Sequence, residues 1–241
     1  MSTRAFPQPH EQAAPGHALG REAAIEDYLK AIYSLQARSG GPVSTGDLAA
    51  RLDVTMAAAS GMARRLAERG LATHEPYRGV ALTESGRRLA LEMVRHHRLI
   101  ETFLAEELGM PWDRVHAEAD VLEHVISEEM EELIARKLGD PSRDPHGDPI
   151  PDADLRIAED DLASLAEAPV GARGVFVRVS DSDPEMLRYL TGRGIAPGDR
   201  FEVVERQPFG GPVFARFAGE VHPLGGALAE AMRVRLEGEG E

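Results

Sequence analysis

The spacing of apolar residues differs between the two ends of this chain of 241 residues, and that difference restricts the fold class most. From Arg21 to Gly139, with one hairpin-like run excepted, apolar residues recur every three or four positions, which is typical of helices with one buried face. From Gly171 onward, short runs rich in Val and Phe, such as GVFVRVS and RFEVVER, predict β-strands. The intervening residues 141–170 are rich in Pro and Asp and predict a linker too polar to pack. We therefore expect a mainly α-helical N-terminal part and a small C-terminal β-barrel.

Two short predicted helices lie close together in the first part of the chain. One covers STGDLAARLD and the other covers VTMAAASGMARRLAERGL, with a turn of only Asp53 and Val54 between them. The next run, LATHEPYRGVALTESG, alternates around a turn at residues 77–79 as a hairpin does. This order predicts a winged helix-turn-helix, although a similar core also occurs in protein-interaction modules.

The second of these helices and the wing carry side chains suited to DNA. Small residues at the start of the helix let its backbone approach a groove, and the arginines behind them can meet phosphates. The predicted DNA contacts are Thr55, Ala57, Ala58, Ser60, Arg64, Arg65, Tyr77 and Arg78. The net charge of −14 argues against nucleic acid for the chain as a whole, but residues 43–100 hold nine arginines and six acidic residues. We therefore expect one basic face on an acidic protein.

Potential metal ligands gather in the run HAEADVLEH, within a stretch that predicts one helix from Trp112 until Gly139. At about 100° per residue, His116, Asp120, Glu123 and His124 share one helix face. One helix earlier, His97 and Glu101 share a face at i and i+4, and Asp27 lies beside the apolar stripe of the first helix. So many carboxylates favour a bound divalent cation, and the absence of cysteine excludes thiolate ligands and disulfides. Oxygen and nitrogen donors suit Mn(II) or Fe(II); the alternative is a solvated acidic face.

The chain resembles the family of the diphtheria toxin repressor and the manganese transport regulator in its winged helix and in the runs EDYLKAIYSL, LTESGRRLA, RHHRLIETFL, VHAEADVLEHVIS and DPHGDPIP. The resemblance covers about residues 22–152, and the C-terminal module is more loosely similar to the SH3-like (FeoA-like) domain of longer members. It implies a homodimer that binds palindromic double-stranded DNA operators when Mn(II) or Fe(II) is bound, and that represses metal-uptake genes. By position, it implies a primary metal site of Asp27, Asp120, Glu123 and His124, and an ancillary site of His97, Glu101 and His116.

The chain departs from the family pattern at several of these positions. Iron-responding members have Met and Cys where this chain has Asp27 and Asp120, so the resemblance favours Mn(II), with Fe(II) as the alternative. The ligands expected from the SH3-like domain align with Asp183 and Met186. Because a thioether is a poor ligand for a hard ion, Glu185 is the expected substitute.

The expected domains follow from these assignments. They are a disordered leader (1–20), a winged-helix DNA-binding domain (21–90), a helical dimerisation and metal-binding domain (91–140), a Pro/Asp-rich linker (141–170) and an SH3-like domain (171–237). The dimer interface is expected to use Leu122, Val125 and Ile126.

One competing hypothesis is a helical di-metal carboxylate enzyme, which would need Glu-x-x-His on each of two helices. This chain lacks that spacing and shows no nucleophile motif, so we do not expect an enzyme. No apolar run has the length of a signal peptide core or a membrane span, so we expect a cytoplasmic protein with no membrane partner.

Overall fold

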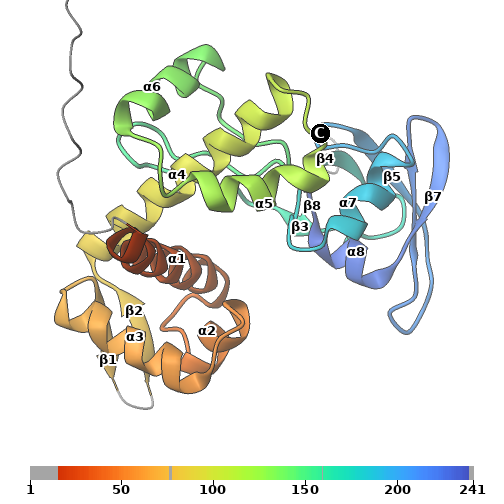
Figure 1. The fold of residues 1–241 in the computed structure, drawn as a ribbon. Coiled ribbons are helices and arrows are strands. Elements are labelled where there is room, and N and C mark those ends of the chain that lie inside the picture. The colour runs from red at the N-terminus through yellow and green to blue at the C-terminus, as the bar shows by residue number, and fades with distance from the viewer. Residues whose placement is uncertain (1–15, 76–77, 159, 239–241) are drawn as a thin grey trace, which may run out of the picture. The chain divides into compact units, whose positions relative to one another are not determined.

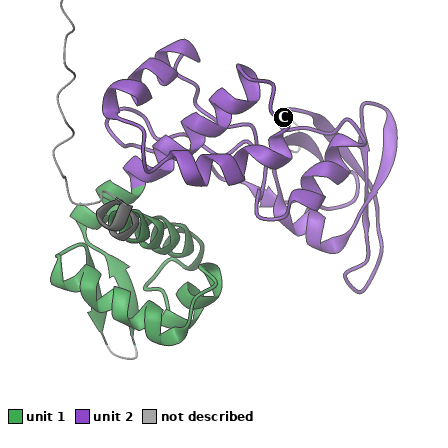
Figure 2. Cartoon of the chain, viewed as in Figure 1, with its two compact units in different colours: residues 1–90 green, residues 91–241 purple. Residues whose placement is uncertain are grey.

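The computed structural model describes residues 16–75, 78–158 and 160–238, which form two compact units, residues 1–90 and 91–241 (Figures 1 and 2). The boundary falls inside one long helix, and each unit is described by itself. Of the predicted leader, residues 1–15 lie outside the described residues, whereas residues 16–20 already belong to the first helix.

Unit 1 is a winged helix, as the sequence predicted. Its elements are α1 (Gly16–Ser39), α2 (Thr45–Arg51), α3 (Met56–Glu68), β1 (Ala72–Glu75), β2 (Gly79–Leu82) and the start of α4 (Glu84–Glu106). Ser44 and Thr55 cap α2 and α3, because their hydroxyl oxygens accept hydrogen bonds from the Asp47 and Ala58 amides at 3.0 and 3.2 Å. The caps fix both ends of the turn between the two helices.

The core of unit 1 is apolar and fully enclosed. It includes Leu29, Ile32, Leu48, Leu66 and Val80, each with no exposed surface. The wing hairpin pairs β1 with β2 in antiparallel fashion, and Val80 also exchanges two main-chain hydrogen bonds of 2.8 Å with Val43. Glycine is required at Gly79, because its φ is +97° and a Cβ would meet the Val43 carbonyl oxygen at 2.5 Å.

Unit 2 begins with three helices: the rest of α4, α5 (Trp112–Leu122) and α6 (Glu128–Lys137). The prediction of one helix from Trp112 until Gly139 is wrong, because the helix ends at Leu122 and a new one starts after Ser127. The Ser127 hydroxyl oxygen accepts a hydrogen bond from the Met130 amide, and this local cap competes with helix continuation. Glu123 and His124 therefore lie in a turn rather than on the helix face.

The C-terminal part of unit 2 is an open, barrel-like antiparallel sheet with strand order β3-β8-β4-β5-β6-β7 (Figure 1). The strands are β3 (Ala163–Ser164), β4 (Arg173–Val179), β5 (Arg200–Arg206), β6 (Val213–Phe217), β7 (Glu220–Leu224) and β8 (Met232–Leu236). Two short helices accompany them, α7 (Pro184–Thr191) and α8 (Gly226–Ala231). Phe176, Leu187 and Met232 lie at the centre of its apolar core.

The polar segment between the helices and the sheet packs closely, so the expectation of an unpacked linker is wrong. Within it, His146 is fully buried, Asp144 and Ile150 are nearly so, and the His146 carbonyl accepts a 3.0 Å hydrogen bond from the Val179 amide. Asp148 pairs with Arg178 at 3.0 Å. The segment is polar because its charges are paired across the fold, which spacing along the chain does not reveal.

No helix in the described part of the chain is long and apolar enough to cross a membrane.

Candidate metal centre

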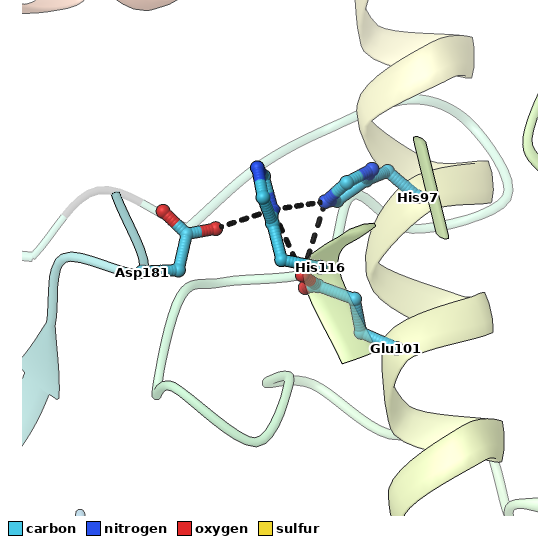
Figure 3. A group of neighbouring side chains, drawn as sticks. All are labelled: His97, Glu101, His116 and Asp181. Atoms are coloured by element: carbon cyan, nitrogen blue, oxygen red, sulfur yellow. Dashed lines mark hydrogen bonds and ion pairs between the residues drawn. The ribbon is translucent and has the colours of Figure 1, made fainter. Parts of the chain in front are cut away.

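Four side chains from three separate segments of unit 2 converge on one point (Figure 3). His97 and Glu101 lie one turn apart on α4, His116 projects from α5, and Asp181 follows strand β4. Glu101 Oε1 lies 3.0 Å from His97 Nε2 and 3.2 Å from His116 Nδ1, and His116 Nδ1 lies 2.9 Å from Asp181 Oδ2. The structure therefore brings together the three predicted ancillary ligands and adds a carboxylate from the SH3-like module.

His97 also faces a second set of acids. Its Nδ1 lies 2.5 Å from Glu123 Oε2 and 3.4 Å from Asp120 Oδ1, while its Nε2 points to the first group. His124 Nε2 lies 3.6 Å from the other oxygen of Glu123. Three of the four predicted primary ligands therefore lie at the turn that ends α5. The fourth, Asp27, is half-buried on α1 of unit 1, and its part in the site stays a prediction.

A third group contains two candidate ligands, Asp144 and His146, that the sequence patterns did not indicate. Glu101, Asp144 and His146 are all buried and offer ligand atoms within 4.8 Å of one another. Glu101 Oε2 and His146 Nδ1 stand 3.7 Å apart, and neither has a hydrogen-bond partner among the residues that the structure describes. A pair of buried polar atoms without partners is costly, and a cation between them would supply what they lack. The missed signal is Asp-x-His-Gly in the run DPHGDP, where Gly147 has a φ of +89°.

The ionisation of the cluster suits a site that exchanges protons for a cation. Burial alone would lower the pKa of His116, but the Asp181 and Glu101 carboxylates raise it to about 10. Burial would likewise lower the pKa of His146, but Glu101 raises it to about 9. Burial would raise the pKa of Glu101, but the neighbouring imidazoles, first of all His116, lower it well below its usual range. Burial would raise the pKa of Asp181, but its hydrogen bond with His116 lowers it to about 2.

The pKa of Asp144 reflects the crowding of acidic groups around it. Burial, together with the Asp148 and Glu101 carboxylates, raises its pKa to about 7, although Arg98 opposes the shift. The donors are all carboxylate oxygens and imidazole nitrogens, which fit a hard or borderline divalent cation.

Asp183 and Glu185 are not brought to the cluster. The Asp183 carboxylate caps α7, accepting a 2.9 Å hydrogen bond from the Glu185 amide, and the Glu185 side chain is 86% exposed and lies 3.8 Å from Arg188. Asp181, two residues nearer to β4, takes the place beside His116 instead. The reason is local: Pro184 starts α7, which commits Asp183 to the cap.

A further acidic group on α4 and α6 is already neutralised. Glu131 lies 2.5 Å from Arg95 Nε and 2.8 Å from His96 Nε2. This pairing accounts for the buried carboxylate without a metal.

The predicted DNA contacts lie on or near the outer face of α3. Thr55, Ala57, Ala58 and Arg64 are exposed, Ser60 and Arg65 are half-buried, and the face that carries Ala59, Ala63 and Leu66 is buried. On the wing, Arg78 is exposed and lies 3.5 Å from Glu75, whereas Tyr77 lies outside the described residues. The contacts themselves stay a prediction.

The fold and the cluster together define a winged-helix DNA-binding protein with a metal-binding domain, and three family matches cover the same parts. Residues 22–80 match the iron dependent repressor N-terminal DNA binding domain, residues 83–152 its metal binding and dimerisation domain, and residues 163–236 the FeoA domain. Among curated proteins, the iron-dependent repressor IdeR of Mycobacterium tuberculosis is 34% identical over 221 residues, 87% of this chain and 95% of that protein. The diphtheria toxin repressor of Corynebacterium glutamicum is 30% identical, over 88% and 96% of the two chains. The chain belongs to the diphtheria toxin repressor family of metal-dependent transcriptional repressors.

Solved structures give the same picture. A manganese-dependent transcriptional repressor in complex with manganese has a TM-score of 0.83 and 45% identity, covering 88% of this chain and all of that one. IdeR of T. acidophilum has a TM-score of 0.72 and 26% identity over 88% of this chain and 97% of its own. These relatives point to a repressor rather than to the di-metal enzyme considered as an alternative.

Proposed function

We propose that this chain is a manganese(II)-responsive repressor of metal-uptake genes that binds palindromic operators as a homodimer. The observation that carries the choice of metal is the donor set. Asp27 and Asp120 supply oxygen at two positions, no cysteine exists in the chain, and every other donor is a carboxylate or an imidazole. Such ligands favour Mn(II) over softer ions, and Fe(II) is the second candidate.

The proposed ligands form two sites. The primary site takes Asp27, Asp120, Glu123 and His124. The ancillary site takes His97, Glu101 and His116, and we assign its ligand from the SH3-like module to Asp181 rather than to Asp183 or Glu185. Glu101 also belongs to the third donor group, and the Glu101 and His146 atoms that lack a hydrogen bond support a cation ligand role for that group as well.

The bound cation supplies positive charge to carboxylates that otherwise repel one another. A primary site that takes Asp27 from α1 would fix the first helix of the DNA-binding domain only when metal is present. Metal and operator would then raise each other's affinity by the same factor, because binding free energies at linked sites are reciprocal.

A homodimer is supported by apolar side chains that stay exposed around α5 and α6. Leu122 and Val125 are exposed, as are Val121, Met130 and Leu133. Ile126 is half-buried against the core that contains Ile100 and Val115. An exposed apolar group of this kind is typical of an interface, and we propose a second copy of the chain as its partner.

The test is a DNA-binding titration on genomic fragments that the protein itself selects. Binding is measured in chelator, Mn(II), anaerobic Fe(II) and Zn(II), and we expect tight binding with Mn(II), weaker binding with Fe(II) and loss in chelator. Asp27→Ala should abolish the metal dependence, whereas Glu22→Ala, at an exposed acid on the same helix, should preserve it. Equal binding in chelator would instead leave a metal-independent winged-helix protein, and a stronger response to Fe(II) would reverse the order of metals.

A further inference from the structure

The single tryptophan of the chain lies against the buried histidine of the third donor group. Trp112 is the first residue of α5, and its indole ring stacks on the His146 imidazole with centroids 5.7 Å apart and planes 18° apart. Its backbone carbonyl accepts a 2.8 Å hydrogen bond from His146 Nε2. His146 thus contacts both the ring and the main chain of one residue.

These contacts decide which nitrogen of His146 faces the metal centre. With Nε2 donating to the Trp112 carbonyl, Nδ1 is the nitrogen directed at Glu101 Oε2, 3.7 Å away. In the neutral ring, this hydrogen bond fixes the tautomer that leaves the Nδ1 lone pair available for a cation. The stacked indole restricts rotation of the ring away from that position.

The indole is held in turn by the SH3-like module. Trp112 Nε1 donates a 2.6 Å hydrogen bond to Thr191 Oγ1, at the last residue of α7. The Thr191 hydroxyl donates to the Leu187 carbonyl at 2.9 Å, so its oxygen lone pairs remain for the indole. The ring also packs against the module's apolar core.

We propose that Trp112 is a positioning residue for the third donor group, which shares Glu101 with the ancillary metal site, and that through Thr191 it couples the position of α7 to the orientation of the His146 imidazole. The inference rests on the proposed metal-binding function. The SH3-like module acts on the site in two ways: Asp181 supplies a carboxylate, and Thr191 orients a histidine through the indole. Groups of this supporting kind typically change metal affinity by about 10- to 100-fold when they are removed.

The experiment compares full-length variants that each remove one link. Trp112→Phe keeps an aromatic ring beside His146 but loses the indole donor, and Thr191→Val removes the acceptor while keeping the side-chain shape. Tyr189→Phe is the matched control, because it removes a hydrogen bond of the same helix, to the Pro223 carbonyl, and keeps both residues of the Trp112–Thr191 hydrogen bond. Mn(II) binding is measured by the electron paramagnetic resonance signal of the free ion, with Asp27→Ala as parent so that the ancillary site is observed alone.

We expect Trp112→Phe and Thr191→Val each to weaken Mn(II) binding about tenfold, and the double variant to be no weaker than either, because both remove one link. Tyr189→Phe should leave the affinity unchanged. The melting temperatures of the metal-free variants should match that of Tyr189→Phe, which a role in packing alone would not produce.

The possible failures are distinguishable. If the parent binds Mn(II) and Trp112→Phe binds it equally well, the inference is overturned while the proposed function stands. An affinity loss that Tyr189→Phe shares also overturns it, because the effect then belongs to general weakening of the module. If the unmodified chain binds no Mn(II), the proposed function fails and the inference fails with it.

Discussion

The winged-helix unit and the metal-binding part of unit 2 are held together by different kinds of contact. Unit 1 has an apolar core around Leu48 and Leu66, and its helices are capped by residues three positions away. At the metal centre, buried Glu101 pairs with His116 and buried His146 pairs with Trp112, and each of these partners lies on another segment of the chain. The first arrangement is stabilised mainly by apolar burial, whereas the second depends on charges that must be matched. Under the proposed function, metal binds in the part of the chain that is held by charge.

The largest loss of stability is expected from a substitution that disturbs the backbone of unit 2. Gly147→Ala places a Cβ 1.9 Å from the Val177 carbonyl oxygen at a φ of +89°, and we expect a loss of about 4 kcal/mol from overpacking and strain combined. Calorimetry should show the loss in unit 2. Gly139→Ala is the control, since its φ is +74° but nothing lies within 4 Å; an equal loss there would refute the role of the close approach.

Leu48→Ala tests the apolar core of unit 1. It removes a fully buried side chain from the core of unit 1 and should cost about 3 kcal/mol. Because no charge of the metal centre is touched, Mn(II) affinity of the ancillary site should be unchanged. Thermal unfolding and Mn(II) titration of one preparation measure both quantities, and weakened Mn(II) binding would show that the two kinds of contact are not separable.

Only the metal-binding part of unit 2 should show a stability and a metal affinity that depend on pH. The raised pKa values of His116 and His146, about 10 and 9, stabilise the metal-free fold fully below pH 6.5, and this stability is lost as the pH rises through those values. Metal binding needs the unprotonated rings, so Mn(II) affinity should rise by up to about tenfold per pH unit for each proton released between pH 6.5 and 8.5. Over the same interval, the melting temperature in chelator should fall. An affinity independent of pH would contradict the assignment, and His116→Gln should reduce the slope.

The smallest expected effect concerns a single cap. Thr55→Ala removes the acceptor for the Ala58 amide and should cost about 1 kcal/mol of stability in unit 1. Thr55→Ser keeps the acceptor and should restore most of it. Urea unfolding distinguishes the two, and an equal loss in both variants would mean that the methyl group, not the hydrogen bond, matters at this position.

The division also explains what could be predicted from the sequence. The turn at Asp53 and Val54 and the i,i+4 pair of His97 and Glu101 are local patterns, and the structure contains both arrangements. The contacts of Asp181 with His116 and of His146 with Glu101 join segments that meet only after folding, so spacing along the chain does not reveal them as candidate ligands. The end of α5 was missed for another reason: Ser127 was a readable cap signal, but the apolar spacing through it favoured one long helix.

The position of His97 between two acidic groups has a consequence for how the chain responds to metal concentration. If a cation takes Nε2, the Nδ1 proton remains on the same ring as the donor to Glu123, 2.5 Å away. A ligand of one site is then the supporting group for a ligand of the other. Under the proposed assignment, occupancy of either site alters the other, and we expect a dose–response curve that differs from that of two independent sites.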